Sequence, residues 1–185
     1  MTILHSLDKK IETLNGTSVA LGMFDGVHRG HGKVLMASVD HARESGTTPC
    51  VFTFALAKFG YDFKNAAQLT DHATTAKLLG EFGFEYALAP NFCAIRDLSA
   101  EAFVEQILHK IMSAKDLFCG ENFTFAKGGK TDCTELSRIA DFFGIKTHII
   151  KTLLDGGEPI SSTRIRALIA KGDTAEAGRL LGRGL

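Results

Sequence analysis

The chain has 185 residues, a length that fits one domain with at most a small appendage. Apolar residues make up 45% and charged residues 23%, as in an ordinary globular protein with a buried core. Lysine plus arginine equals aspartate plus glutamate at 21 each, which argues against nucleic acid as the main partner because nucleic-acid-binding domains carry a basic excess.

The cysteines indicate a reducing environment. Cys50, Cys93, Cys119 and Cys133 form no CxxC pair, and none has a histidine at zinc-finger spacing. The first ten residues lack the pattern of a signal peptide, and no apolar run approaches the length of a membrane span. We therefore expect free thiols, a cytoplasmic location and no membrane partner.

The first third of the chain predicts a strand, a helix and a second strand. Apolar, β-forming residues predict strands over 17–24 and 50–54. Between them, residues 33–45 have the apolar spacing of a helix, with Gly46 placed to end it. This order implies parallel strands joined by a right-handed crossover.

The alternation continues to the end of the chain. Further helices are predicted over 72–82, 101–112, 134–143, 163–170 and 174–181, and further strands over 84–89, 117–119 and 145–150. Thr70 or Asp71, then Ser99, are suitable N-caps, and Asp173 with Glu176 resembles a capping box. Together these elements predict a single α/β domain over 1–185 with a Rossmann-like, doubly wound parallel sheet.

A first chemical motif, His28-Arg29-Gly30-His31, follows the first strand and opens the first helix. Ligands bind beyond the carboxyl ends of parallel strands, and a helix N-terminus attracts phosphate. Gly30 permits close approach of the backbone, and His28 and His31 can stabilise charge that develops during phosphoryl transfer. A zinc site is the less favoured alternative, because no third ligand is evident nearby.

A second motif contains Ser161, Ser162, Thr163 and Arg164 at the start of a predicted helix. A simple N-cap is one interpretation. The other is a second phosphate site in which hydroxyl groups and an arginine surround the ligand. By contrast, Gly129-Lys130-Thr131 is not the end of a P-loop, because Thr124 stands where that motif needs glycine.

The stretch from Gly22 to His31 resembles the signature of the adenylyltransferase (FAD synthetase) module of prokaryotic bifunctional riboflavin kinase/FMN adenylyltransferases, within the HxGH nucleotidyltransferase superfamily. Residues 160–166 resemble it as well, and shorter matches run in order from about 17 to 183. The resemblance implies that ATP binds with Mg²⁺ and that FMN attacks its α-phosphorus, giving FAD and pyrophosphate. The protein would then be a flavin- and nucleotide-binding transferase.

The resemblance also implies roles for individual residues. His28, His31 and Arg164 would be catalytic. The metal ligands stay unassigned. Substrate-binding positions would be Gly22, Phe24, Asp25, Gly30, Ser161, Ser162, Thr163 and Asn122, with Asn122 on the flavin side.

The sequence departs from the family pattern in three places, and the first bears on the acceptor. Ala55-Leu56-Ala57-Lys58 stands where the family usually has Asp-Pro-His-Pro, which predicts a looser, more positive flap over the flavin. Ala126 and Thr131 replace glycines that are common in the family. The riboflavin kinase domain is expected to be absent, so that activity would come from a separate protein.

The alternatives are a nucleotidyltransferase for another phosphorylated small molecule, or a non-catalytic nucleotide or flavin sensor.

Overall fold

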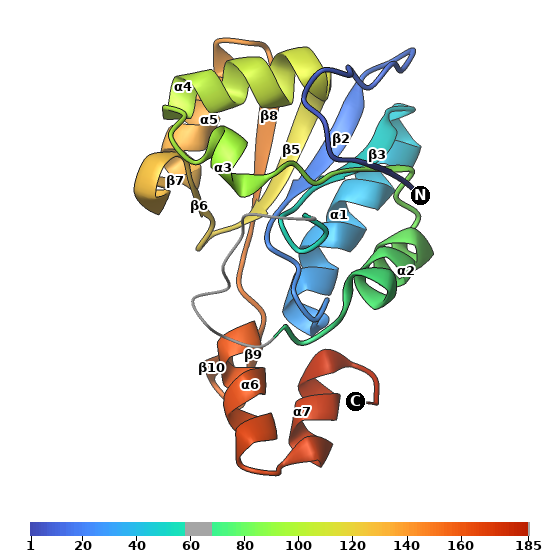
Figure 1. The fold of residues 1–185 in the computed structure, drawn as a ribbon, viewed down its shortest axis with the longest axis vertical. Coiled ribbons are helices and arrows are strands. Elements are labelled where there is room, and N and C mark those ends of the chain that lie inside the picture. Colours follow the sequence, from blue (N-terminus) through green and yellow to red (C-terminus); the bar gives the residue numbers. More distant parts are fainter. Residues whose placement is uncertain (58–67, 185) are drawn as a thin grey trace.

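The computed structural model describes residues 1–57 and 68–184, and its centre is a six-stranded sheet (Figure 1). The strand order is β1-β4-β3-β2-β5-β8, and all neighbouring strands are parallel. The bounds are β1 (Thr2–Leu4), β2 (Thr17–Leu21), β3 (Thr48–Phe52), β4 (Tyr86–Leu88), β5 (Ala114–Gly120) and β8 (Lys146–Ile150). The predicted doubly wound parallel sheet is therefore confirmed.

Helices cover both faces of the sheet, and a helical pair lies beyond its carboxyl edge (Figure 1). On one face lie α1 (Arg29–Ser45) and α2 (His72–Phe82); on the other lie the π-helix η1 (Phe103–Ile111) and α5 (Cys133–Asp141). The pair consists of α6 (Ser162–Ala170) and α7 (Thr174–Leu181). The short elements are α3 (Phe92–Ile95), α4 (Ala100–Ala102), β6 (Thr124–Phe125), η2 (Lys127–Gly129), β7 (Thr131–Asp132), β9 (Leu154–Asp155) and β10 (Glu158–Pro159).

Burial on both faces explains the unbroken apolar runs of the central strands. In β2, Val19 and Leu21 pack into the cluster beneath η1 and α5. Ala20 points the opposite way and packs beneath α1 with Leu35 and Val39. In a strand covered on both sides, an apolar residue at any position adds to the buried apolar surface. A continuous apolar run therefore predicts a buried strand.

Several predicted boundaries shift for local reasons. The strand predicted over 17–24 is β2 and ends at Leu21. It does not include Phe24, because that residue has a φ of 54° and lies outside the extended conformation. The first helix begins at Arg29, four residues before the predicted start, because His28 caps it. The helix expected over 101–112 is mostly π-helical, with the Met112 N–H donating to the carbonyl of Ile107.

The helix caps agree with the predicted ones. Asp71, and not Thr70, caps α2, and Ser99 caps α4. Gly46 ends α1 with a φ of 70°, a conformation that suits glycine. Asp173 accepts from the Glu176 N–H at the start of α7.

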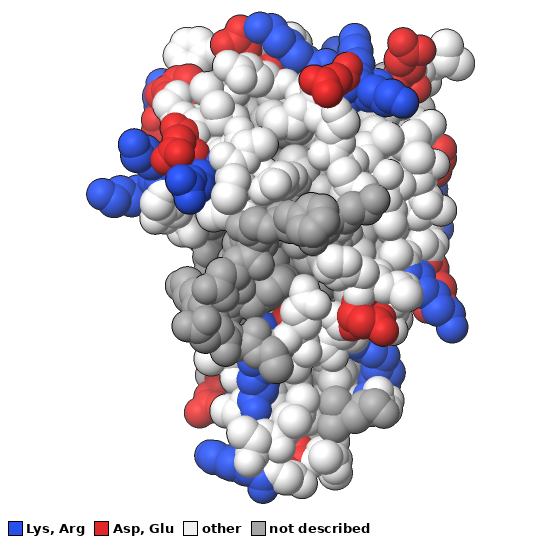
Figure 2. Space-filling view, viewed as in Figure 1, with Lys and Arg blue, Asp and Glu red and all other residues white. Residues whose placement is uncertain are grey.

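Charge is mixed on the outside of the molecule. On the face in Figure 2, acidic and basic side chains lie interspersed around the edges, as the balanced composition predicted. Over residues 1–57 and 68–184, no helix is both long and apolar enough to cross a membrane. All four cysteines are free thiols, and Cys93 is exposed.

Candidate active site

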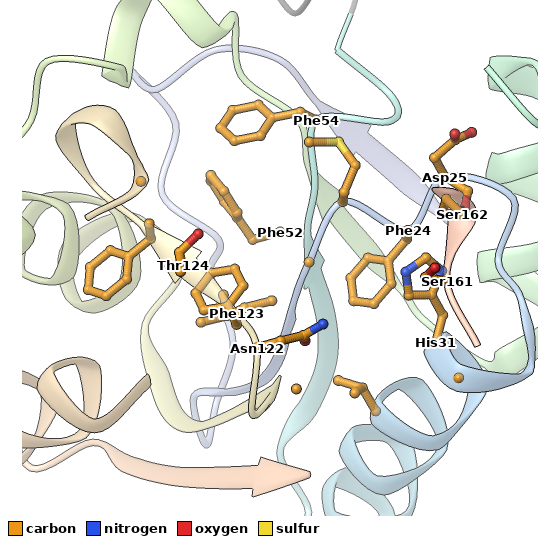
Figure 3. Close-up of a pocket in the computed structure, with 18 of the residues that line it drawn as sticks. Phe24, Asp25, His31, Phe52, Phe54, Asn122, Phe123, Thr124, Ser161 and Ser162 are labelled. Carbon is orange, nitrogen blue, oxygen red and sulfur yellow. Dashed lines mark hydrogen bonds between the residues drawn. The ribbon is translucent and has the colours of Figure 1, made fainter. Parts of the chain in front are cut away.

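A cavity of about 750 Å³ opens at the carboxyl edge of the sheet (Figure 3). Leu21, Gly120 and Ile150, at the ends of β2, β5 and β8, line one part of it. The opposite wall comes from the start of α6. This is where an open parallel sheet is expected to bind a ligand, and the volume lies in the range of small-molecule sites.

His28 and His31 form one unit at the N-terminus of α1. Nδ1 of His28 accepts a hydrogen bond from the His31 N–H at 3.1 Å, so His28 is the N-cap of the helix. The two imidazole rings stack with centroids 3.6 Å apart, and His31 meets the edge of Phe24. Both histidines line the cavity, and Nδ1 of His31 is a buried nitrogen with no partner among the described residues.

Burial keeps this histidine pair uncharged at neutral pH. Desolvation lowers the pKa of His28 from 6.5 to about 4, and the nearby Arg183 guanidinium adds to the effect. Desolvation also takes the pKa of His31 well below its usual range, and the proximity of His28 lowers it further. Phosphate oxygens entering the cavity would favour the protonated rings, because an opposite charge stabilises the cationic form.

The loop between β2 and α1 has an unusual backbone. Phe24, Gly26 and Val27 have φ values of 54°, 79° and 39°. Such values cost energy for non-glycine residues and persist only when the surroundings enforce them. Here Arg183, which follows α7, donates to the carbonyls of Gly26 at 2.6 Å and Val27 at 3.2 Å. The end of the described chain therefore fixes the loop that carries the histidines.

Two glycines of the motif allow close packing in the site. A Cβ on Gly30 would lie 3.1 Å from the His28 ring and 3.2 Å from the carbonyl oxygen of Ile160. A Cβ on Gly22 would lie 2.7 Å from the ring of Phe24. Gly30 thus lets α1 approach the segment before α6, as its place in the motif suggested.

The second motif lies on the same side of the cavity as the histidines (Figure 3). Ser161 caps α6 by accepting from the Arg164 N–H, and the Ser162 hydroxyl donates to the carbonyl of Asp25 at 2.9 Å. Thr163 also lines the cavity. The positive ends of α1 and α6 therefore open onto one space, which favours an anion between them.

Asp25 and Arg166 join the two motifs. The Asp25 carboxylate is buried, accepts from the Leu69 N–H at 2.9 Å and pairs with the Arg166 guanidinium. Burial raises the pKa of Asp25, and the bonds from Leu69 and Arg166 work against this. Arg166 lines the cavity and was not singled out from the sequence, although it stands two residues after Arg164 in the same motif.

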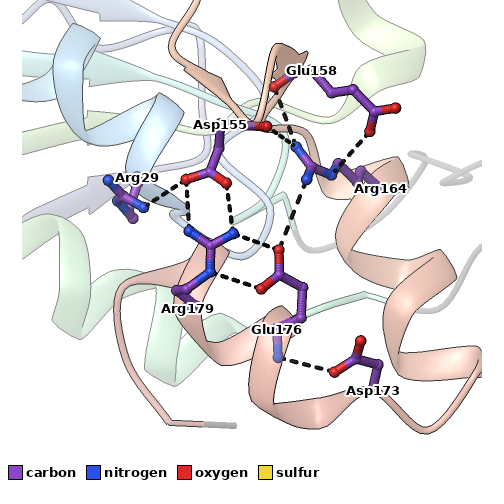
Figure 4. A network of polar contacts seen from close by, with 7 residues as sticks. All are labelled: Arg29, Asp155, Glu158, Arg164, Asp173, Glu176 and Arg179. Carbon is purple, nitrogen blue, oxygen red and sulfur yellow. Dashed lines mark hydrogen bonds and ion pairs between the residues drawn. The ribbon is translucent and has the colours of Figure 1, made fainter.

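Arg164, predicted to be catalytic, is not among the described residues that line the cavity. Its guanidinium donates to the carbonyls of Asp155 at 3.1 Å and Glu158 at 3.2 Å, and pairs with Glu158 and Glu176 (Figure 4). Arg179 joins the same network through Asp155 and Glu176. In this arrangement Arg164 holds the β9–β10 hairpin against α6 and α7.

The other half of the cavity is aromatic. Asn122 lies between this half and the histidines (Figure 3). The aromatic lining comes from β3 and the residues just after it, from α3 and η1, and from the segment around β6. It consists of Phe52, Phe54, Phe92, Phe103, Phe123 and Phe125. Edge-to-face contacts hold several of these rings, such as Phe52 against Phe103 at 5.2 Å. A flat aromatic ligand fits this chemistry.

The segment that departs from the family pattern is partly packed. Ala55, Leu56 and Ala57 are buried, and the Ala57 N–H donates to the carbonyl of Phe54. This part is therefore not a loose flap, because its buried apolar side chains, Leu56 above all, pack against the core. Lys58, which was expected to add positive charge, lies outside the described residues.

Comparison with known proteins gives a consistent result. The FAD synthetase family matches residues 10–164. A bifunctional riboflavin kinase/FMN adenylyltransferase from Escherichia coli (strain K12) is 31% identical over 183 residues, covering 97% of this chain and 58% of that protein. The chloroplastic FAD synthetase 1 of Arabidopsis thaliana is 27% identical over 190 residues, covering 91% of this chain and 52% of that protein. The chain thus spans a little over half the length of these relatives.

A solved structure resembles the whole fold. It is described as a macrolide-efflux protein from Streptococcus pneumoniae, and it superposes with a TM-score of 0.83 at 28% identity. The match covers 98% of this chain and 61% of that chain.

Proposed function

The chain belongs to the FAD synthetase family, and we propose that it transfers the adenylyl group of ATP to FMN, giving FAD and pyrophosphate. The observation that carries the proposal is the two-sided cavity. One side has two helix N-termini, two histidines and Arg166, which suit a triphosphate. The other side is aromatic and suits the isoalloxazine ring of a flavin.

The triphosphate would lie between α1 and α6. We infer that Gly22, Phe24 and Gly30 shape the nucleotide side, and that Ser161, Ser162, Thr163 and Arg166 hold phosphate oxygens. The buried, unpartnered Nδ1 of His31 supports this arrangement, because a buried polar group without a partner is costly unless a ligand satisfies it.

His28 and His31 would act on the transition state. The attacking FMN phosphate adds to the α-phosphorus while the bond to pyrophosphate breaks, so negative charge moves toward the leaving oxygens. A neutral imidazole keeps one ring N–H, so His28 would donate through Nε2 while its Nδ1 caps α1, and His31 would donate through a ring N–H to the same oxygens. Positioning and charge neutralisation would supply the catalysis, without a covalent enzyme intermediate.

Mg²⁺ would enter with ATP and be held chiefly by its phosphates. Asp25 is the one carboxylate among the described lining residues, and Arg166 and the Leu69 N–H already occupy it. Mg²⁺ commonly uses few protein ligands beside substrate phosphates. Arg164 would contribute indirectly, by fixing the hairpin and helices next to the phosphate side.

A chromatographic assay tests the proposal. The chain is incubated with ATP and Mg²⁺ and with FMN, riboflavin or non-flavin phosphates in turn, and the products are separated. FAD formed from FMN alone supports the proposal. A nucleotidyl product from a non-flavin phosphate, with none from FMN, would favour a nucleotidyltransferase of different specificity. Binding of ATP or FMN without any product would favour a sensor.

A further inference from the structure

A second group of chemically active side chains lies away from the cavity. His41 comes from α1, Asp116 from β5 and His148 from β8. In the parallel pairing of these strands, Phe118 stands beside His148 and Asp116 stands beside Lys146. Since side chains two apart in a strand share a face, Asp116, Phe118 and His148 all point toward α1, where His41 meets them.

The three side chains converge on one small volume. Nε2 of His148 lies 2.8 Å from Oδ1 of Asp116, and Nε2 of His41 lies 3.1 Å from Oδ2 of the same carboxylate. One nitrogen or oxygen of each residue lies within 4.8 Å of those of the other two. Bond lengths of about 2.0–2.2 Å in a tetrahedral zinc site place ligand atoms roughly 3.3–3.6 Å apart. A small outward movement would therefore admit an ion between them.

Packing holds the imidazoles in this orientation. The ring of His148 stacks on Phe118 with centroids 4.4 Å apart and planes 5° apart, and the His41 ring lies 5.4 Å from Phe118. The exposed fractions of the His41, Asp116 and His148 side chains are 30%, 13% and 25%. Partial exposure leaves a path for an ion and for a water as fourth ligand.

We propose that His41, Asp116 and His148 form a binding site for a divalent transition-metal ion of the zinc type. Two imidazoles and one carboxylate are the ligands such an ion prefers, whereas Mg²⁺ prefers oxygen ligands alone. None of the three residues is among the described residues that line the cavity, so this site is separate from the proposed adenylyl transfer. A bound ion would tie the second half of α1 to β5 and β8.

The site predicts a metal-dependent gain in stability. Metal-free protein, prepared with a chelator, should melt several degrees higher when Zn²⁺ is added in excess of its Kd. Co²⁺ added to the native protein should give the visible absorption of a low-coordinate site. His41→Gln and His148→Gln should each bind Co²⁺ at least about tenfold more weakly and lose the Zn²⁺-dependent rise in Tm.

Three further variants make the test specific. Asp116→Asn should also lose Co²⁺ binding. If this variant does not fold, the Co²⁺ affinities of His41→Gln and His148→Gln test the proposal on their own. His109→Gln, a change at an exposed histidine of η1, should keep both signals. His31→Gln should keep them too, which excludes the histidine pair of the cavity. Equal Co²⁺ binding by all variants, or no Co²⁺ absorption in the wild type, would overturn the proposal whatever the outcome of the FAD assay.

Discussion

Replacing His28 by Asn should remove a pH-dependent contribution to stability while keeping the cap of α1. His28 caps the helix through a side-chain acceptor, and asparagine is among the best residues at that position. Asparagine does not titrate, however. The variant therefore separates the capping hydrogen bond from the cost of keeping a buried imidazole unprotonated.

The magnitude follows from the pKa of His28, which falls from 6.5 to about 4 on burial. Between these values the unfolded chain binds a proton that the folded chain excludes, so the free energy of unfolding decreases as the pH falls. Each pH unit in that window corresponds to about 1.4 kcal/mol. The His28 imidazole should thus cost the wild type about 2 kcal/mol between pH 6.5 and pH 5, at the full slope.

Urea unfolding of both proteins, measured at intervals from about pH 7.5 to about pH 5, tests this expectation. The pH dependence that remains in His28→Asn should be smaller by up to about 2 kcal/mol over the acidic range. His109→Asn is the matched control, because His109 is exposed, and it should keep the wild-type profile. Parallel profiles for wild type and His28→Asn would refute the conclusion that burial excludes the proton from His28.

Three activity predictions concern other residues of the site, each measured as FAD formation. His31→Ala should lower kcat on the order of a hundredfold or more with little change in the KM for ATP, and unchanged turnover would make the residue structural. Arg183→Ala should raise the KM for ATP and lower Tm, because it frees two loop carbonyls, whereas Arg138→Ala should do neither. Arg166→Lys should reduce kcat/KM more than Arg164→Lys, since only Arg166 lines the cavity; the reverse order would restore Arg164 to the phosphate side.

Much of the fold could be predicted because the elements of the sheet and its covering helices are strongly patterned. The central strands contain short apolar runs, and α2 and α7 begin and end at the predicted residues. The short elements were missed for a physical reason. The hairpins β6–β7 and β9–β10 have two-residue strands, and β1 has three, so none shows a period that a sequence can reveal.

The two motifs of the candidate site could be found because their residues are contiguous. Which side chains line the cavity could not be predicted, because Arg164 and Arg166 are both part of the second motif and only the helix geometry separates them. The aromatic wall comes from distant segments, and the group formed by His41, Asp116 and His148 joins three elements. The aromatic wall and this group both depend on contacts between elements that are distant in the chain, and a single sequence does not reveal such contacts.

The hydrogen bonds from Arg183 to the carbonyls of Gly26 and Val27 imply an order in which parts of the protein fold during synthesis. The Gly26 and Arg183 partners stand 157 residues apart in the chain. At roughly 5–20 residues per second, a ribosome would need about 8–30 s to add Arg183 after Gly26. β2 and α1 leave the ribosome early. The loop between them, which carries His28, lacks the hydrogen bonds that stabilise its left-handed backbone until Arg183 has been synthesised. A nascent chain should therefore acquire most of its sheet before the loop that carries His28 takes its final conformation.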